Sequence, residues 1–448
     1  MEETKKRDQF GSRIGFILAA AGSAIGLGNI WKFPYITGEN GGSAFIIVYL
    51  IAIALVGFPV MLSEFLIGRK AQKDAVNSFK TLAPGKPWYF TGYMGVVAAF
   101  MILSFYGVVA GWTITYTWEA VSGSLLSMDA SQYPDHFVEL ISSPLKPILY
   151  QILFMVLTIA IVLGGVKKGI EKWSKILMPL LLVLLLIVVA RSVTLEGASA
   201  GIEFLLKPDF SALTATSFLV ALGHAFFSLS LGMGTMITYG SYLSKKENLP
   251  MAAVNVSIAD TAIALLAGFA IFPAVFAFGM EAGGGPGLLF MTLPAVFQQL
   301  PLGTFFATIF FALVVIAALT SAISILEVPV AFFTEKFKWS RAKATWFLGI
   351  VITLVGMVAS LSYGPWGGFT IGGKVFFDQL DFVASYILLP LGGFFIALFV
   401  AWGMKRKEAF EAAGYEEKSS FGSFWIFTLK FIAPILIIIV FLNSIGII

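Results

Sequence analysis

Long apolar stretches separated by short polar segments run through the chain and predict membrane-spanning helices. A helix needs about 20 mainly apolar residues to cross the hydrocarbon core of a bilayer. Eleven stretches have this length, namely 13–37, 41–68, 92–122, 147–165, 173–191, 213–241, 250–279, 304–334, 342–362, 376–403 and 424–446. The pattern therefore predicts an all-α integral membrane protein, with eleven transmembrane helices in a single transmembrane domain over residues 1–448.

Two of these stretches are interrupted near their middle by glycine-rich segments. The first runs from Gly22 to Gly28 and the second from Ser228 to Gly234, and both end in glycine, one large apolar residue, then glycine. Each glycine weakens a helix by about 1 kcal/mol relative to alanine. The breaks fall in the first helix of two five-span halves, 13–191 and 213–403, with 424–446 as an additional helix. An odd number of spans per half predicts an inverted repeat.

Helix breaks at membrane depth favour a binding site. Lipid cannot satisfy the freed backbone groups, so such backbone must lie against protein or a water-filled cavity. The carbonyl end of a half-helix suits a small cation, and its amide end suits a carboxylate. Close packing of helices is the alternative role for small residues in spans, but two matched breaks favour binding. The side-chain oxygens available nearby belong to Ser23, Asn29, Ser228, Ser230, Thr320 and Ser321.

Composition and charge support a membrane protein and exclude several other classes. Only 12% of the 448 residues are charged and 58% are hydrophobic, against about 25% charged in soluble proteins. The absence of cysteine excludes disulfides and thiol chemistry, and two histidines argue against a histidine metal centre. The predicted inner segments hold 23 of the 29 basic residues. This bias predicts a multi-pass protein of the cell membrane with a cytoplasmic N-terminus and an extracellular C-terminus, and it explains the net charge of +4 without a nucleic-acid partner.

Three segments resemble one transporter family. The run GSAIGLGNIWKFP from Gly22 to Pro34 resembles the span-1 signature of neurotransmitter:sodium symporters. GHAFFSLSLGMG, starting at Gly223, resembles their span 6, and LTS, ending at Ser321, resembles their span 8. Order and spacing match over essentially the whole chain. The resemblance implies the leucine-transporter fold, and places the chain near the bacterial eleven-span members that carry several hydrophobic amino acids.

The resemblance implies two sodium sites. The first would use Ala24, Asn29, Ser228 and a span-7 residue, here Asp260 in place of the family's usual asparagine. The second would use the backbone oxygens of Gly22, Ile25 and Ala317 with the hydroxyls of Thr320 and Ser321. An ionised Asp260 would supply negative charge directly at the first site, so chloride would not be required. The alternative is that Asp260 pairs with a loop lysine.

The resemblance also implies a substrate pocket in which the Tyr106 hydroxyl binds a carboxylate. Monoamine carriers of the family have an aspartate at the position of Gly26, so glycine here favours a substrate that brings its own negative charge. Apolar side chains at the other end of the pocket favour neutral hydrophobic L-amino acids, aromatic ones included. The predicted pocket residues are Ser23, Ala24, Leu27, Gly28, Ile102, Tyr106, Phe227, Ser228, Ser230, Met233, Ser321 and Ile325.

The resemblance also implies gates on both sides. Lys32 stands where many members of the family have arginine, and with Asp381 it would close the outer side, loosely or through water, because lysine lacks the guanidinium fork of arginine. His224 either joins this gate or is a packing residue. The resemblance places an inner gate at Arg7 and Glu335, supported by Ser241 and Tyr242.

Other features of the spans allow two interpretations each. Glu64 either accepts hydrogen bonds from amides freed at a break or extends its carboxylate to the membrane surface. Gly169 and Pro179 mark either an unwinding point in span 5 or an ordinary proline kink. Glu327 has no predicted role beyond pairing with a cation.

The sequence thus predicts a sodium-coupled secondary active importer of neutral hydrophobic L-amino acids that works by alternating access. A sodium-dependent amino-acid receptor of the same fold, without net transport, is the alternative. Gates on both sides argue against a channel. No nucleophile–base set or phosphate-binding loop indicates an enzyme. The expected partners are the amino acid, sodium ions and the lipid bilayer, and the sequence does not indicate an oligomeric state.

Overall fold

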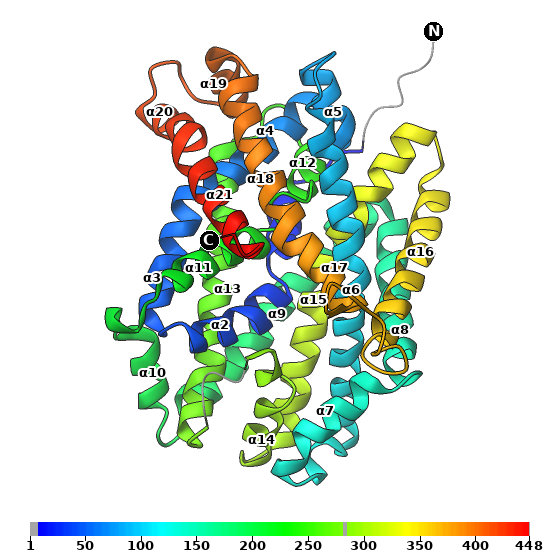
Figure 1. Ribbon diagram of the computed structural model, residues 1–448, viewed down its shortest axis with the longest axis vertical. Helices are drawn as coiled ribbons and strands as arrows, with labels where there is room; N and C mark the ends of the chain where they lie inside the picture. The colour runs from blue at the N-terminus through cyan, green and yellow to red at the C-terminus, as the bar shows by residue number, and fades with distance from the viewer. Residues whose placement is uncertain (1–7, 281–284, 448) are drawn as a thin grey trace.

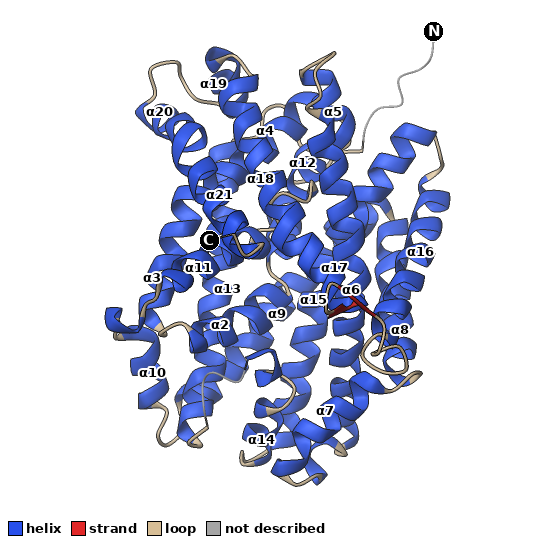
Figure 2. Cartoon of the chain, in the orientation of Figure 1, coloured by secondary structure: helices blue, strands red, loops and turns tan. Residues whose placement is uncertain are grey.

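Helices make up most of the computed structural model, which describes residues 8–280 and 285–447 (Figures 1 and 2). Nine of the described helices are long and apolar enough to cross a membrane. They span Ser43–Ala71, Tyr89–Ser122, Lys146–Leu163, Val166–Val193, Leu249–Ala277, Gly303–Phe337, Arg341–Leu361, Phe376–Gly403 and Ser420–Ser444. The predicted all-helical membrane architecture is therefore confirmed.

The two remaining predicted spans are broken where the glycines lie. In the first, α1 (Arg13–Ala24) is followed by the π-helical turn η1 (Gly28–Lys32) and α2 (Phe33–Glu39), with a bend of 48° between the two parts. In the second, α11 (Ala215–Ser228) and α12 (Thr235–Gly240) are separated by residues 229–234. The bent pair counts as a tenth span, whereas α11 and α12 are individually too short to cross a bilayer. The total of eleven therefore stays a prediction.

Four of the nine long spans combine α-helix with π-helical turns, and the other five are single α-helices. Their elements are α3 (Ser43–Ala52), η2 (Ile53–Gly57), α4 (Phe58–Ala71), α6 (Tyr89–Ser122), α8 (Lys146–Leu163), η5 (Val166–Glu171), α9 (Lys172–Val193), α13 (Leu249–Ala277), α15 (Gly303–Phe337), α16 (Arg341–Leu361), α17 (Phe376–Asp381), η8 (Phe382–Leu388), α18 (Leu389–Leu398), η9 (Phe399–Gly403), α20 (Ser420–Phe427), η10 (Thr428–Ile432) and α21 (Ala433–Ser444).

Short elements connect the spans at both ends of the molecule. They are α5 (Ala75–Leu82), η3 (Leu125–Ser127), η4 (Ala130–Gln132), α7 (Tyr133–Ser142), α10 (Ser199–Leu206), η6 (Phe210–Ala212), η7 (Gly285–Leu288), α14 (Thr292–Gln298), the antiparallel strands β1 (Thr370–Ile371) and β2 (Lys374–Val375), and α19 (Arg406–Ala413). Helices α5 and α19 lie at one end, and α7, α10 and α14 lie at the other (Figure 1). Below, the end with α5 and α19, which the charge bias predicts to be cytoplasmic, is called the inner side.

The start of span 5 is helical throughout. Gly169 lies within η5, and Pro179 lies inside α9, which continues on both sides of it. A Cβ atom on Gly169 would approach the backbone oxygen of Ile161 to 2.1 Å. In this structure, close packing of η5 against α8 accounts for the glycine, and no unwinding accompanies the proline.

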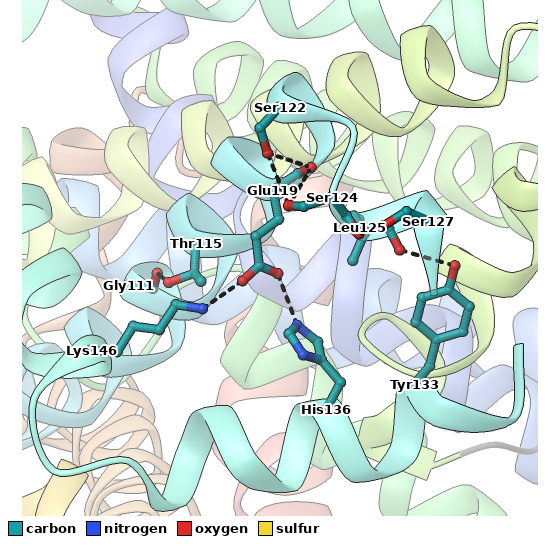
Figure 3. A network of polar contacts seen from close by, with 10 residues as sticks. All are labelled: Gly111, Thr115, Glu119, Ser122, Ser124, Leu125, Ser127, Tyr133, His136 and Lys146. Carbon is teal, nitrogen blue, oxygen red and sulfur yellow. Dashed lines mark hydrogen bonds and ion pairs between the residues drawn. The ribbon is translucent and has the colours of Figure 1, made fainter. Parts of the chain in front are cut away.

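A buried polar network anchors α7 to α6 on the outer side (Figure 3). The carboxylate of Glu119 lies 2.6 Å from Lys146 Nζ and 2.9 Å from His136 Nε2. The Tyr133 hydroxyl donates to the backbone oxygen of Leu125 at 3.2 Å. Because Glu119 is only 8% exposed, these partners compensate a carboxylate that would be costly to bury alone. The network gives the outer end of α6 a fixed wall.

Candidate functional site

The two helix breaks meet at the centre of the molecule. The Ser230 hydroxyl of the second break donates to the backbone oxygen of Ser23 in α1, at 2.9 Å. Ser230 has a left-handed backbone with φ of 54°, which costs a non-glycine residue about 1–3 kcal/mol. Such strain persists only where surrounding contacts hold it, and functional sites are the usual place.

The second break is also tied to α4. Gly232, with φ of 80°, donates its amide to Glu64 Oε1 at 2.8 Å. Glu64 is fully buried, so its carboxylate does not extend to the surface of the protein. Of the two predicted roles for Glu64, the geometry corresponds to the acceptor of an amide freed at the break.

Polar side chains from four elements meet beside the first break, and we call Asn29, Tyr49, Ser228 and Asp260 the first cluster. Asn29 Nδ2 donates to Asp260 Oδ1 at 2.7 Å, and the Ser228 hydroxyl donates to the same atom at 2.9 Å. The Tyr49 hydroxyl lies 3.3 Å from Asp260 Oδ2. No ion pair joins Asp260 to a lysine among the described residues. The predicted neighbours Asn29, Ser228 and Asp260 are thus together.

Sequence reasoning missed Tyr49. It lies in α3, fully buried within an apolar span, and a buried tyrosine hydroxyl usually requires a hydrogen-bond partner. That requirement was the available signal, but nothing in the sequence indicated which partner. The amide of Asn29 also has an orientation that the sequence did not predict, since its Oδ1 accepts from the Gly26 amide at 3.0 Å.

Neutral oxygens form a second cluster between α1 and α15, consisting of Gly22, Ile25, Ala317, Thr320 and Ser321. The Ser321 hydroxyl lies 3.3 Å and 3.2 Å from the backbone oxygens of Gly22 and Ile25. The Thr320 hydroxyl lies 2.9 Å from the Ala317 oxygen and 3.4 Å from the Ile25 oxygen. All five residues predicted for the second sodium site are therefore adjacent.

The chemistry of both clusters suits an alkali cation. Unwound backbone carbonyls and half-helix ends coordinate sodium in transporters built this way, and both clusters combine such oxygens with hydroxyl or carboxylate groups. Within residues 8–280 and 285–447, no group of three or more His, Cys, Asp or Glu could hold a metal ion. The donor set therefore fits sodium better than a transition metal.

A small buried cavity lies between the two clusters. Its free volume is about 20 Å³, room for about one water molecule, so the surrounding side chains must move apart to admit a larger ligand. Of the predicted pocket residues, Leu27 and Ser228 do not line it: the Leu27 amide donates to Tyr106 at 3.2 Å, and Ser228 belongs to the first cluster. The lining residues are Ser23, Ala24, Gly26, Gly28, Ile102, Tyr106, Phe227, Ser230, Met233, Ser321 and Ile325.

Gly26 lines this cavity in a position that leaves no room for a side chain. A Cβ atom there would lie 2.3 Å from the Ser321 hydroxyl oxygen and 2.7 Å from the Tyr106 hydroxyl oxygen. The absence of a side chain at Gly26 is therefore a steric requirement as well as an electrostatic one. Met233 and Phe227 give the cavity apolar walls, while Tyr106 presents a hydroxyl next to the first break.

On the outer side of the cavity, Lys32 lies over aromatic rings. Its Nζ is 4.5 Å from the centre of the Phe227 ring and 5.8 Å from that of Tyr386. Asp381 accepts from the Ser385 hydroxyl at 2.6 Å. No ion pair within 4.0 Å joins Lys32 and Asp381, both of which the structure describes. In this structure Lys32 makes cation–π contacts instead of a direct ion pair with Asp381. The sequence prediction was of a loose or water-bridged gate, which does not require a direct pair.

His224 packs beside the first cluster. Its ring lies 5.9 Å from Phe33 in a stacked arrangement and 5.3 Å from Tyr49. The side chain is 2% exposed, and neither ring nitrogen has a hydrogen-bond partner among the described residues. Of the two predicted roles, the geometry corresponds to packing.

On the inner side, Glu327 binds Arg341 in a bidentate ion pair with distances of 3.0 and 2.5 Å. The Tyr242 hydroxyl donates to Glu327 Oε1 at 2.6 Å, and Arg341 Nε donates to the backbone oxygen of Val162 at 2.8 Å. Glu327 is fully buried, and Arg341 is the cation that pairs with it. The sequence predicted a pairing with a cation but not which residue supplies it. The network joins α8, α15, α16 and the residues that follow α12.

The predicted inner gate is only partly within the described residues. Arg7 lies outside them, so its pairing with Glu335 stays a prediction. Glu335 accepts the amide of Asp74 at 2.9 Å. The Ser241 hydroxyl donates to the backbone oxygen of Thr238 at 2.5 Å.

The start of α1 is fastened to η5 through Glu171. This carboxylate accepts from the Gly11 amide at 2.5 Å and the Ser12 hydroxyl at 2.8 Å, and it pairs with Lys175 at 2.6 Å. A negative charge at a helix N-terminus is favourable because it meets the positive end of the helix dipole. Glu171 therefore holds the inner half of span 1 in place.

Comparisons with known proteins agree with this geometry. A sequence model of the sodium:neurotransmitter symporter family matches residues 7–133 and 141–448. An uncharacterized sodium-dependent transporter of Bacillus subtilis, YhdH, is 45% identical over 445 residues, which cover 99% of each chain. A sodium- and chloride-dependent taurine transporter of Bos taurus is 25% identical over 460 residues, covering 89% of this chain and 71% of the relative.

A solved structure has the same fold. The crystal structure of MhsT in complex with L-phenylalanine superposes with a TM-score of 0.92 at 54% sequence identity, covering 98% of this chain and 100% of MhsT. This confirms the predicted leucine-transporter fold, while the boundaries of the two repeats stay a prediction. The chain therefore belongs to the sodium:neurotransmitter symporter family, a family of sodium-dependent membrane transporters.

Proposed function

We propose that the protein is a sodium-coupled importer of neutral hydrophobic L-amino acids. The observation that carries this proposal is the placement of a small, largely apolar cavity between two oxygen clusters at paired helix breaks. Binding a substrate between two cation sites couples the two ligands because each completes the surroundings of the other.

The two clusters are proposed as two sodium sites. The first would hold its ion through Asp260 and Ser228 with the backbone oxygen of Ala24, after the Asn29 amide turns its oxygen inward. The second would hold its ion through carbonyls of α1 and hydroxyls of α15. Because Asp260 carries its own negative charge, chloride is not required in this proposal.

The cavity is proposed to bind the amino acid with its carboxylate toward Tyr106 and the amides near Leu27 and Gly28. Its side chain would lie against Ile102, Phe227, Met233 and Ile325. The crystal structure of MhsT holds L-phenylalanine, which supports an apolar and aromatic substrate for a chain that is 54% identical to it. Gly26 supports an amino acid over an amine.

The transport cycle follows from these contacts. Sodium would order both breaks and favour the outward-open state, after which the amino acid binds and Lys32 and Phe227 close over it. Release to the inner side would require the start of α1 to leave Glu171 and the Glu327–Arg341 network to open. Sodium entry contributes about 2.3 kcal/mol per charge per 100 mV, in addition to its concentration gradient. We place the N-terminus in the cytoplasm.

Uptake of each of the twenty amino acids into proteoliposomes, with sodium outside, tests the proposed substrate class. Phenylalanine, tryptophan, tyrosine and the branched aliphatic residues should be taken up, and aspartate, glutamate, lysine and arginine should not. Preference for a charged amino acid would contradict the assignment. Saturable, sodium-dependent binding without accumulation would favour a receptor of the same fold.

A further inference from the structure

A second cavity opens at the inner side, remote from the central site. Its volume is about 420 Å³, which lies within the range of about 300–1,000 Å³ common for ligand pockets. Two segments far apart in the sequence form it, residues 73–81, which include most of α5, and residues 335–338 at the end of α15. We call this cavity the lysine pocket, and its lining residues are Lys73, Asn77, Lys80, Thr81, Glu335, Lys336 and Lys338.

The lysine pocket has an excess of positive charge. Four lysines and one glutamate line it. Among the described residues, no ion pair within 4.0 Å joins any of the four lysines to a carboxylate. By contrast, Lys70 and Lys175 on the same side of the molecule pair with Glu408 and Glu171 at 2.5 and 2.6 Å. Bringing four like charges together is unfavourable unless an anion compensates them.

The walls of the pocket are held by contacts of their own. Asp74 caps α5 by accepting from the amides of Val76 and Asn77, and its own amide donates at 2.9 Å to Glu335, which lines the pocket. Lys338 ends α15 in a left-handed conformation with φ of 55°. The lysines are therefore presented by fixed backbone, which lowers the entropic cost of binding.

Aromatic rings form one side of the lysine pocket. Lys80 Nζ lies 5.3 Å from the centre of the Tyr89 ring, and Lys336 Nζ donates to the Tyr93 hydroxyl at 2.9 Å. Both tyrosines lie in the first turns of the spanning helix α6. Tyrosine and lysine together at the end of a span are typical of the depth at which lipid headgroups lie, and basic pockets between spans on the cytoplasmic side bind anionic headgroups.

We propose that the lysine pocket binds a phosphate-bearing anion, either the headgroup of an anionic lipid or a free phosphate. Lysine binds phosphate as a compact point charge, and Asn77 and Thr81 supply neutral donors. Lys73 and Lys338 have no aromatic or ion-pair contact among the described residues, so they are the lysines whose ammonium groups are available to the ligand. This site is separate from the central cavity and does not depend on the proposed transport activity.

Two arms of one binding experiment distinguish the sources, both using the full-length protein in detergent. The first arm counts phosphatidylglycerol molecules retained by the protein in native mass spectrometry, with phosphatidylcholine as the neutral comparison. The second arm measures radiolabelled inorganic phosphate by equilibrium dialysis without added lipid. We expect saturable binding in at least one arm, and the arm that shows it identifies the source.

Matched variants test the site. K73Q/K338Q should weaken binding by at least about tenfold, because each lysine near the headgroups contributes substantially to anion attraction. K73R/K338R, which keeps the charge, and K245Q/K246Q, which removes equal charge from another exposed inner loop, should bind like the original chain. The proposal is overturned if neither probe binds saturably, if phosphatidylcholine is retained equally, or if K245Q/K246Q loses as much binding as K73Q/K338Q.

Discussion

The two clusters beside the cavity differ in charge and in the elements that build them. The first contains a buried carboxylate, Asp260, and takes Asn29 from η1, beyond the first break. The second contains only neutral oxygens and takes Gly22 and Ile25 from the end of α1. If α1 swings away while η1 stays, the second cluster loses its carbonyls and the first keeps its side chains. The first cluster is therefore suited to hold charge and the second to sense the position of α1.

The largest effect is expected from a new carboxylate at Gly26, because it would bring a negative charge next to Ser321 of the otherwise neutral second cluster. G26D would place its side chain within 2.3 Å of Ser321 and 2.7 Å of Tyr106 unless they move, and its charge would oppose a substrate carboxylate. We expect amino-acid uptake to be lost while the protein still purifies as a monodisperse species. Uptake at the original rate would contradict the role assigned to Gly26.

Removing the charge of the first cluster should have the next largest effect. D260N keeps the shape of the side chain but removes a full charge from contact with the ion, an interaction worth about 4 kcal/mol at 4 Å near a protein surface. The sodium concentration for half-maximal uptake should rise at least about 100-fold. E119Q, which neutralises a buried carboxylate on the outer side, is the control and should leave the half-maximal sodium concentration unchanged.

Removing one neutral oxygen from the second cluster should have a smaller effect. S321A deletes a hydroxyl that lies against three backbone carbonyls at the end of α1, and the loss of one such contact costs about 1.4 kcal/mol, or about tenfold in sodium affinity. S360A, a buried serine of α16 whose hydroxyl has no partner among the described residues, is the matched control. An effect of S321A as large as that of D260N would remove the contrast between the clusters.

A weaker effect is expected from Tyr49, which contributes only its hydroxyl to the first cluster. Y49F should raise the half-maximal sodium concentration about two- to tenfold, as for one hydrogen bond to a buried group. Y116F removes a buried hydroxyl without a described partner and should leave sodium dependence unaltered. Equal behaviour of the two variants would show that Tyr49 does not support Asp260.

Replacing chloride by gluconate should have the smallest effect. With Asp260 as the fixed negative charge, uptake at saturating sodium should stay within about 20% of its rate in chloride, since no anion has to accompany the first ion. A large loss of uptake in gluconate would mean that Asp260 does not provide this charge.

Hydropathy and glycine content predicted the long spans and the positions of both breaks, because lipid constrains span length and glycine destabilises helices locally. The π-helical turns such as η5 and η8 were not predicted, since they reflect hydrogen-bond register rather than composition. Contacts between distant segments, such as Tyr49 with Asp260 and Arg341 with Glu327, depend on how the spans pack. The contacts of Lys32 also depend on this packing: its aromatic neighbour Tyr386 comes from η8, whereas the sequence suggested only Asp381 as its partner.

Concentrative uptake of radiolabelled L-phenylalanine into proteoliposomes tests the central claim most directly. The same vesicles are compared under an inward sodium gradient and under an equal potassium gradient, with membrane potential clamped. Accumulation above the external concentration with sodium, abolished in D260N at the same sodium concentration and kept in E119Q, is the predicted result. Equal accumulation with potassium, or none with sodium for any hydrophobic amino acid, would contradict sodium-coupled import.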